Sequence, residues 1–553
     1  MCRIKEFARN HFSSIYESVR GLYKRHAENK RFGQWNRIIS STADKSQFSG
    51  QAEGQRIIVM SMIGNMYLTN FEMLLALALN ARGANVEMVF DDAVFPLCEL
   101  TTEDVVEKGQ IGFCSRCVAN MKSMTSRASL KIRLLSEFCD KGILESFRQR
   151  AEKVDLSRVL SYEEDGVPIG RPAVMVALRH FRKGTIGNSP KEAAVIRKYL
   201  VSAMITKYAV EKLGAEGRIA LAIMSHGIYT SWEPALFAFK KAGMPVVAYD
   251  RQAGIGKYQF NWNSSPQNGD ISSAWEGRWR NRKLTEVQHK EAVEYLASRE
   301  TFARESAKFS KTPPKDPVVL RSELDIPTSK TALLLVSNLV WDAAAVGQDL
   351  IFNDTLEWVC KTIEIVSRYP NKLHLIVKPH PAEVMRGTKL FVAEEVCKLI
   401  PHLPSNVTIL QADADVNPMS LMKAIDVGIS HTSTAGFEMA ALGKPVIPVS
   451  KAHYRSKGFT FDPDSFEQYA SFIQNADTLK ALYTDQMKEL ALKYMYVRAF
   501  KYQHYIPLLK ESGYLNCVGY NLSAMDDLLP GRFEDFDFVC DAILKHRQDF
   551  VKD

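Results

Sequence analysis

Apolar and polar residues alternate along the chain in two separate stretches of repeated strand and helix pattern. In the first stretch, an apolar run over 56–63 is followed by a helical pattern over 70–82 and a second apolar run over 85–90. Continuous apolar strands separated by helices are typical of parallel sheets that are covered on both faces. Another unit of this kind occupies 219–250. The pattern predicts a first doubly wound α/β domain over residues 51–310.

The second stretch begins after a segment rich in proline, lysine and serine, which predicts an interdomain linker over residues 311–331. Beyond the linker, short apolar runs again alternate with helical patterns. The strands are expected at 332–338, 373–379, 407–410, 427–430 and 445–450. This alternation predicts a second doubly wound domain over residues 332–484.

The two ends of the chain have a different pattern. Residues 485–553 show helical periodicity without strand alternation, which predicts helices that pack back toward the first domain. Residues 1–40 hold nine Lys or Arg against three Glu, with apolar residues every three to four positions, and predict a basic amphipathic helical arm within residues 1–50. Such an arm suits an anionic membrane surface or an acidic partner, or it simply packs on the main body.

Composition narrows the class of protein. Apolar and charged fractions of 46% and 24% are those of a soluble globular protein, and no apolar run is long enough to span a bilayer. The charged amino terminus lacks the apolar block of a secretory signal, which predicts a cytoplasmic protein, peripheral on the inner membrane face through its arm. Nine scattered cysteines predict free thiols, and Cys114 and Cys117 lack the second pair that a zinc site needs.

Candidate binding chemistry follows the strand at 373–379. Ligands of open α/β sheets bind outside the carboxyl ends of the strands, and here Lys378, His380 and Glu383 emerge at such an end. The prolines on both sides of His380, of which Pro381 is one, restrict the backbone and fix the direction of the imidazole. A single histidine is commonly structural, but this arrangement favours a hydrogen-bond donor to a phosphate or a ribose.

The stretch "HTSTAGFE" follows the next buried strand in the same way. Thr432, Ser433 and Thr434 form a turn, and Gly436 begins a helix whose free backbone N–H groups and dipole attract anions. Glu438, one turn into this helix, is expected to accept hydrogen bonds from sugar hydroxyls. The alternative is that Ser433 or Thr434 only caps the helix.

Together, "VKPHPAE" and "ADVGISHTSTAGFEMAALGKPVI" resemble the carboxyl-terminal domain of bacterial GT-B glycosyltransferases, which have two Rossmann-like domains and build capsule and other surface polysaccharides. The pair of motifs is similar to that of CMP-Kdo-dependent capsule transferases, bacterial sialyltransferases and CDP-glycerol glycerophosphotransferases. The resemblance implies that the histidine and the hydroxyls hold the phosphate and ribose of a nucleotide, without a metal or another cofactor. It covers about residues 330–465 and maps onto His380, Pro381, Ser433, Thr434, Gly436, Glu438, Gly443, Lys444 and Pro445.

The acceptor and the catalytic base are then expected in the first domain. "SYEEDGVPIG" is similar to the acidic motif that carries the general base of bacterial sialyltransferases, which implies this role for Glu164 or Asp165, although acidic residues before glycine also form exposed turns. His226, at the end of a buried strand, is a third catalytic candidate. Other residues expected at the cleft are Arg179, Tyr229, Arg251, Asn338 and Asp342.

The sequence therefore predicts an α/β protein of GT-B architecture, with two Rossmann-like domains facing a cleft and helical extensions at both ends. Its expected activity is metal-independent transfer of a sugar from a nucleotide-activated donor, foremost a CMP-activated acid sugar such as Kdo, to a surface polysaccharide or lipid-linked glycan. The alternatives are a CDP-polyol phosphotransferase, a UDP-sugar-dependent transferase or epimerase, and a non-catalytic nucleotide-binding relative. No nucleic-acid partner is expected, because no platform of basic and aromatic residues is present.

Overall fold

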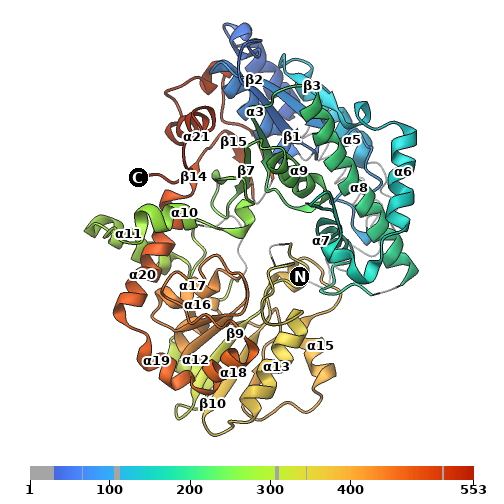
Figure 1. The fold of residues 1–553 in the computed structure, drawn as a ribbon. Helices are drawn as coiled ribbons and strands as arrows, with labels where there is room; N and C mark the ends of the chain where they lie inside the picture. The colour runs from blue at the N-terminus through green and yellow to red at the C-terminus, as the bar shows by residue number, and fades with distance from the viewer. Residues whose placement is uncertain are drawn as a thin grey trace, which may run out of the picture.

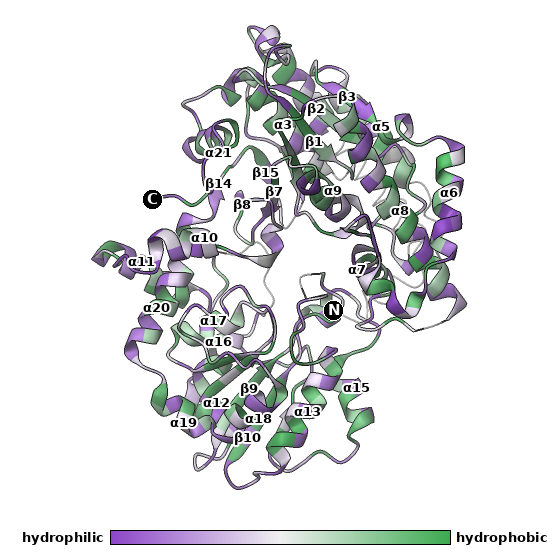
Figure 2. Ribbon diagram, viewed as in Figure 1, coloured by the Kyte–Doolittle hydropathy of each residue, from purple (hydrophilic) through white to green (hydrophobic). Residues whose placement is uncertain are grey.

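The computed structural model describes residues 30–553 except 65, 105–112, 188, 305–309, 344 and 514–515. The chain forms two lobes, each built around its own sheet with helices on both faces (Figure 1). The sheets carry mostly apolar residues, and the outward sides of the surrounding helices are more hydrophilic (Figure 2). The predicted α/β class with two doubly wound domains is confirmed.

The first sheet has seven strands in the order β14-β8-β7-β6-β1-β2-β3. The strands from β3 to β7 in this order are parallel, whereas β8 is antiparallel to β7 and β14 is antiparallel to β8. Continuous apolar strands form the centre because both faces are covered. The bounds are β1 (Arg56–Ser61), β2 (Asn85–Phe90), β3 (Lys131–Leu134), β6 (Leu221–Ser225), β7 (Val246–Arg251), β8 (Lys257–Trp262) and β14 (His504–Tyr505).

Two groups of helices cover this sheet. The crossover helix after β1, α3, lies against α5 and α21, while α7, α8 and α9 pack against one another beside α6. A two-stranded ribbon of β4 (Glu163–Glu164) and β5 (Val167–Pro168) precedes α7. The helices are α3 (Met66–Ala81), α5 (Phe113–Thr125), α6 (Lys141–Glu152), α7 (Gly170–Phe181), α8 (Pro190–Ala215), α9 (Tyr229–Lys241) and α21 (Glu534–Leu544).

The second sheet is parallel throughout, in the order β11-β10-β9-β12-β13. Along β9, Leu333 and Leu335 enter one apolar core while Ala332 and Leu334 enter the other, as expected for a strand that is buried on both faces. The strands are β9 (Thr331–Val336), β10 (Leu373–Lys378), β11 (Val407–Ile409), β12 (Val427–Ser430) and β13 (Val446–Pro448). The helices are α13 (Thr355–Ser367), α14 (Ala382–Met385), α15 (Val392–Leu399), α16 (Pro418–Ala424), α17 (Ala435–Ala441), α18 (Phe466–Gln474) and α19 (Ala476–Leu482).

The border between the lobes falls earlier in the chain than residue 310. Trp275 and Trp279, together with Ala292 of α11 (Glu286–Ser298), belong to the core of the second lobe. The segment expected to link the domains contains α12 (Pro317–Glu323), which packs against α16. The predicted boundary lies too late in the chain because the polar composition of residues 311–331 is typical of a linker. Trp275 and Trp279, which anchor the second lobe, precede that segment.

The carboxyl-terminal segment crosses from one lobe to the other. Helix α20 (Asp485–Tyr496) packs on the second lobe, and the chain then returns to the first lobe through β14, a ribbon of β15 (Leu509–Glu511) and β16 (Cys517–Tyr520), and α21 (Figure 1). The expectation of an entirely helical extension was wrong. These strands have only two to four residues, which is too short to show strand alternation, and they form because tertiary partners offer open edges.

Residues 30–40 form a helix that lies on the first lobe. The Trp35 indole N–H donates to the carbonyl of Met124 at 2.9 Å, and the Arg31 guanidinium donates to the carbonyl of Cys517 at 2.6 Å. This end of the predicted basic arm therefore packs on the body. The rest of the arm, residues 1–29, lies outside the described residues. Within the part of the chain that the structure describes, no helix is long and apolar enough to cross a membrane.

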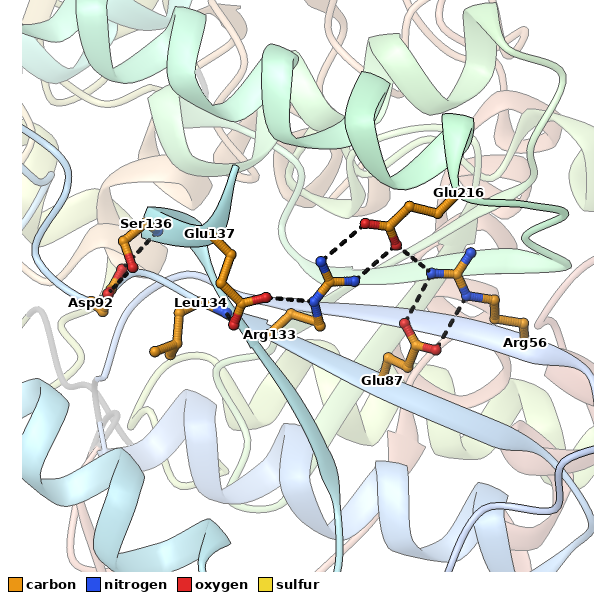
Figure 3. A network of polar contacts seen from close by, with 8 residues as sticks. All are labelled: Arg56, Glu87, Asp92, Arg133, Leu134, Ser136, Glu137 and Glu216. Carbon is orange, nitrogen blue, oxygen red and sulfur yellow. Dashed lines mark hydrogen bonds and ion pairs between the residues drawn. The ribbon is translucent and has the colours of Figure 1, made fainter. Parts of the chain in front are cut away.

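A chain of ion pairs ties the outer strands of the first sheet to the end of α8 (Figure 3). The Arg56 guanidinium donates to the carboxylates of Glu87 at 3.0 Å and of Glu216 at 3.2 Å, and Arg133 donates to Glu216 at 2.8 Å and to Glu137 at 2.6 Å. Because its members are partly exposed, the network contributes little to the stability of the fold.

Candidate functional site

The two predicted motifs meet at the carboxyl edge of the second sheet. Strand β9 lies between β10 and β12, so the residues that follow these three strands emerge side by side. Asn338, after β9, donates its side-chain amide to the hydroxyl of Thr432, after β12, at 2.7 Å. His380 follows β10 at the same edge. The structure thus brings three of the predicted residues to one end of the sheet, where ligands of such folds bind.

His380 is held in one orientation by its own loop. Its Nδ1 accepts a hydrogen bond from the backbone N–H of Ala382 at 3.0 Å, and Pro381 begins the short helix α14. Burial, aided by the charge of Lys378, lowers the pKa of His380 to about 4. The imidazole is therefore neutral near pH 7, and because Nδ1 accepts, the ring proton resides on Nε2.

Lys378 and Glu383 support this loop. The Lys378 ammonium donates to the carbonyls of Gln411 at 3.0 Å and Ala412 at 2.9 Å, and burial lowers its pKa to about 8. Glu383 is fully buried, and burial raises its pKa to about 7. Both side chains are buried and are not accessible to a ligand. This differs from the expectation that Lys378 and Glu383 contact the nucleotide.

The turn after β12 is fixed by a buried tyrosine. The hydroxyl of Tyr454 donates to the carbonyl of Ser433 at 3.0 Å and lies 2.8 Å from the hydroxyl of Ser430. A Cβ atom on Gly436 would lie 2.1 Å from the Tyr454 hydroxyl oxygen, so only glycine fits here. Ser433 also accepts from the N–H of Ala435 at 3.3 Å, as in the capping alternative, while Thr434 is exposed. No local sequence signal pointed to Tyr454.

Glu438 lies in α17 with its carboxylate turned toward another helix. Its Oε1 accepts from Arg299 Nε at 2.9 Å, and the Glu438 side chain is 7% exposed. Arg299 follows directly after α11. This ion pair joins α17 to the end of α11, a helix that the sequence assigned to the first domain. Glu438 therefore helps to position the turn that precedes α17.

The first lobe presents His226 and Tyr229 at the end of β6. The His226 backbone N–H donates to the carbonyl of Tyr249 at 2.6 Å, and its ring packs edge-on against Tyr229 and Trp232. Burial lowers the pKa of His226 to about 3, although part of the residue remains exposed. Gly227 and Tyr229 both adopt positive φ, of 63° and 66°. Such backbone strain outside glycine is concentrated at functional sites.

Charged groups from both lobes surround this turn. The Arg179 guanidinium lies over the Tyr229 ring at 5.2 Å and faces the buried carboxylate of Glu99, whose pKa burial raises to about 7. Burial raises the pKa of Tyr229 and of Asp250 on β7, and the charge of Asp342, in the loop after β9, adds to both. The charge of Asp342 therefore acts on groups of the first lobe.

Two further buried acids lie in the elements next to this turn, Glu233 in α9 and Asp250 in β7. Glu233 pairs with Arg171 at 2.7 Å, and Asp250 accepts from the Gln267 side-chain amide at 2.9 Å. Burial raises the pKa of both carboxyls to about 7. Carboxyls that titrate near neutral pH within a cleft are typical of functional sites.

Glu164, Asp165 and Arg251 are not brought to this cluster. Asp165 is exposed, pairs with Lys207 at 2.9 Å, and its carbonyl accepts from Lys241. Lys241 ends α9, whereas Tyr229 begins it, which separates the two by roughly 18 Å of helix. Glu164 accepts from the Tyr162 hydroxyl at 3.0 Å. The Arg251 side chain is buried in an ion pair with that of Glu511 in β15.

Among the described residues, no group of three or more His, Cys, Asp or Glu side chains is placed to hold a metal ion. Cys114 and Cys117, at the beginning of α5, are not joined in a disulfide.

Comparisons with known proteins agree with the motif assignment. Residues 342–505 match the family described as capsule polysaccharide biosynthesis protein. A search of curated proteins gave no significant match. Similar solved structures include two from Thermosulfurimonas dismutans: KpsC β-Kdo 2,4 transferase (16% identity, 52% of this chain and 82% of that chain, TM-score 0.33) and KpsC β-Kdo 2,7 transferase (15%, 57% and 85%, 0.31).

A glycosyltransferase from Rickettsia africae is also similar, with 11% identity, 81% of this chain and 94% of that chain covered, and a TM-score of 0.26. Structural likeness at these TM-scores carries no conclusion about activity or substrate. The conclusion rests on the sequence match and on the two motifs at neighbouring strand ends. Over residues 342–505 the chain matches the capsule polysaccharide biosynthesis proteins, so the resemblance predicted from the sequence is confirmed.

Proposed function

We propose that this protein is a glycosyltransferase of surface polysaccharide biosynthesis that uses a nucleotide-activated sugar. The observation that carries the proposal is the convergence of His380, Asn338 and Thr432 at one edge of the second sheet, within the segment that matches the capsule family. Neutral donors that are fixed before the ligand arrives suit a diphosphate or monophosphate ester and its ribose.

The donor is proposed to be CMP-activated, with an acid sugar such as Kdo foremost. The motif pair resembles that of CMP- and CDP-using enzymes, and the imidazole N–H, the amide and the hydroxyls supply hydrogen bonds without a metal. A CDP-polyol phosphotransferase would bind the nucleotide through the same residues but would transfer a different group. A UDP-sugar enzyme would prefer another nucleotide. A non-catalytic relative would bind a nucleotide without turnover.

An inverting transfer needs a group that accepts the proton of the attacking hydroxyl. We propose His226 and Asp342 for this role: His226 is a neutral imidazole at the end of β6, and Asp342 is a carboxylate whose charge acts on Tyr229 and Asp250 of the first lobe. We favour them over Glu164 and Asp165, which lie a helix length away. The acceptor glycan then occupies the first-lobe side, and the basic arm over 1–40 is proposed to hold the protein at an anionic membrane surface.

The donor assignment is tested by measuring the binding of CMP, CDP, UDP, GDP and dTDP, with and without a chelator. We expect CMP or CDP to bind best and the chelator to have no effect; a preference for UDP would contradict the donor class, and loss of binding with chelator would contradict metal independence. His380→Ala should weaken binding by about 1.5–3 kcal/mol, because a hydrogen bond to a charged phosphate is lost. The exposed His402→Ala is the matched control and should leave the affinity unchanged.

A further inference from the structure

A cavity of about 370 Å³ lies between the lobes, next to the proposed nucleotide site. It is enclosed by the segment before α7, by α7 and α8, and by the loop between β9 and α13, at the place where α7 approaches the second lobe (Figure 1). His431, which directly precedes Thr432, lines the cavity. The volume is within the usual range for small-molecule sites.

The first-lobe wall of this cavity is apolar. Most of its side chains are aliphatic and come from the segment before α7, from α7, from the loop before α8 and from α8, with Ser157 and Thr185 as the polar members. On the opposite side, Val340 and Val346 extend the apolar surface. Leu160 is 55% exposed although it lines the cavity, so the apolar surface continues outward to solvent. The aliphatic side chains of the first-lobe wall are Leu156, Val159, Leu160, Val174, Leu178, Ile186 and Ile196.

Beside Val340 and Val346, the second-lobe wall of the cavity carries polar side chains, none of which is Lys or Arg. The carboxylate of Asp349 lies 3.0 Å from Nε2 of His431, and the histidine is 7% exposed. Asn353 and Asp354 complete this wall, and none of the described residues that line the cavity is Lys or Arg. A phosphate or carboxylate placed here would meet the carboxylates of Asp349 and Asp354, which is costly. The guanidinium of Arg171, which lies against Gly347, is already paired with the carboxylate of Glu233. Hydroxyl groups, in contrast, can donate to Asp349 and Asn353.

We propose that this cavity is an acceptor subsite that binds an uncharged amphiphile. The hydroxyl-bearing head lies against Asp349 and Asn353, and the apolar part lies along α7 and leaves past Leu160. This inference rests on the proposed glycosyltransferase function, because a subsite beside Thr432 places the head group next to the bound donor. It also restricts the acceptor class: the recognised portion is a neutral glycoside, and an anionic lipid head does not fit here.

The subsite is tested by calorimetric titration of the full chain with octyl glucoside below its micelle concentration, with octyl phosphate and glucose in parallel. We expect octyl glucoside to bind at least about tenfold more tightly than either. Ala345→Phe adds a ring at a residue that lines the cavity, and Leu160→Asp adds a charge at a lining residue that is exposed to solvent; both should weaken binding at least about tenfold. Leu399→Asp, an equally exposed leucine on α15, is the control and should have no effect.

Equal or tighter binding of octyl phosphate would overturn the proposal, and so would binding of octyl glucoside that Ala345→Phe leaves unchanged. Nucleotide binding, measured separately on the same preparations, distinguishes this outcome from failure of the proposed function. If octyl glucoside behaves as expected while no nucleotide binds, the cavity assignment stands and the glycosyltransferase assignment fails. If nucleotides bind and octyl glucoside does not, the reverse holds.

Discussion

Burial, more than charge pairing, sets the protonation of the residues at the strand ends. His380 and His226 have pKa values lowered to about 4 and about 3, and both are neutral at physiological pH. Burial raises the pKa values of the Glu233 and Asp250 carboxyls to about 7. A small change of pH or the arrival of a charged ligand therefore changes their protonation. Near neutral pH, these two acids and Glu99 are therefore able to exchange protons, whereas His226 and His380 stay uncharged.

The buried carboxyl of Glu72 predicts how the free energy of unfolding depends on pH. Glu72 accepts hydrogen bonds from the hydroxyls of Ser61 and Tyr249, and burial raises its pKa from 4.5 to about 8. The folded state therefore binds this proton more tightly than the unfolded state. The stabilisation is complete below the unfolded pKa and is lost as pH rises toward and through about 8.

Glu72→Gln cannot ionise, so its free energy of unfolding should not show this loss. Between about pH 5 and about pH 8 the wild type should lose at least about 1.4 kcal/mol relative to the variant, the equivalent of one pKa unit. Urea denaturation at several pH values measures the difference. The exposed Glu145→Gln should follow the wild-type curve. Parallel curves for Glu72→Gln and wild type would show that Glu72 stays ionised.

At the scale of elements, the site depends on how the β12–α17 turn is packed. Gly436 leaves room for the Tyr454 hydroxyl, which in turn holds the carbonyl of Ser433. Gly436→Ala should cost about 1–3 kcal/mol, because backbone or tyrosine must shift. It should also weaken nucleotide binding, since the displaced turn carries Thr432.

The control for this variant is Gly277→Ala, where an added Cβ has no neighbour within 4 Å. It should be neutral or stabilise by up to about 1 kcal/mol. Thermal denaturation and CMP titration of both variants provide the comparison. If Gly436→Ala keeps both stability and affinity, the turn tolerates the shift and Tyr454 does not determine its position.

At the scale of the whole molecule, the carboxyl-terminal segment fastens the two lobes together. It leaves the second lobe after α20 and adds β14 to the first sheet, where Arg251 and Glu511 form an ion pair with side chains 1% and 0% exposed. Glu511 also accepts from the backbone N–H of Gly256 at 3.1 Å. A buried pair of this kind is costly to break from one side only.

Arg251→Met and Glu511→Leu, made singly, should each lower the free energy of unfolding by about 3–5 kcal/mol, because each leaves an uncompensated buried charge. The double variant should recover most of this loss. Breaking the exposed pair of Arg280 and Glu276 instead should change stability by at most about 1 kcal/mol. Guanidinium denaturation measures all four, and additive losses in the double variant would contradict a coupled pair.

The sequence by itself determined the two sheets and the site motifs on the second one. Most predicted strands lie within about two residues of the observed ones, because a strand buried on both faces must be apolar throughout. The observed β2 and β12 even have the predicted bounds. His380 and Thr432 were found because a polar turn after a buried strand is a local pattern that needs no knowledge of the partner lobe.

Tertiary structure decided what these local patterns could not. Which polar side chains face the cleft depends on partners far along the chain: Lys378 donates to carbonyls after β11, Glu438 pairs with Arg299, and Arg251 pairs with Glu511. The short strands of the carboxyl-terminal segment exist only because the first sheet and its ribbon offer open edges. Hydrogen-bond partners and burial depend on which distant segments pack together. They cannot be read from the local pattern of a single sequence.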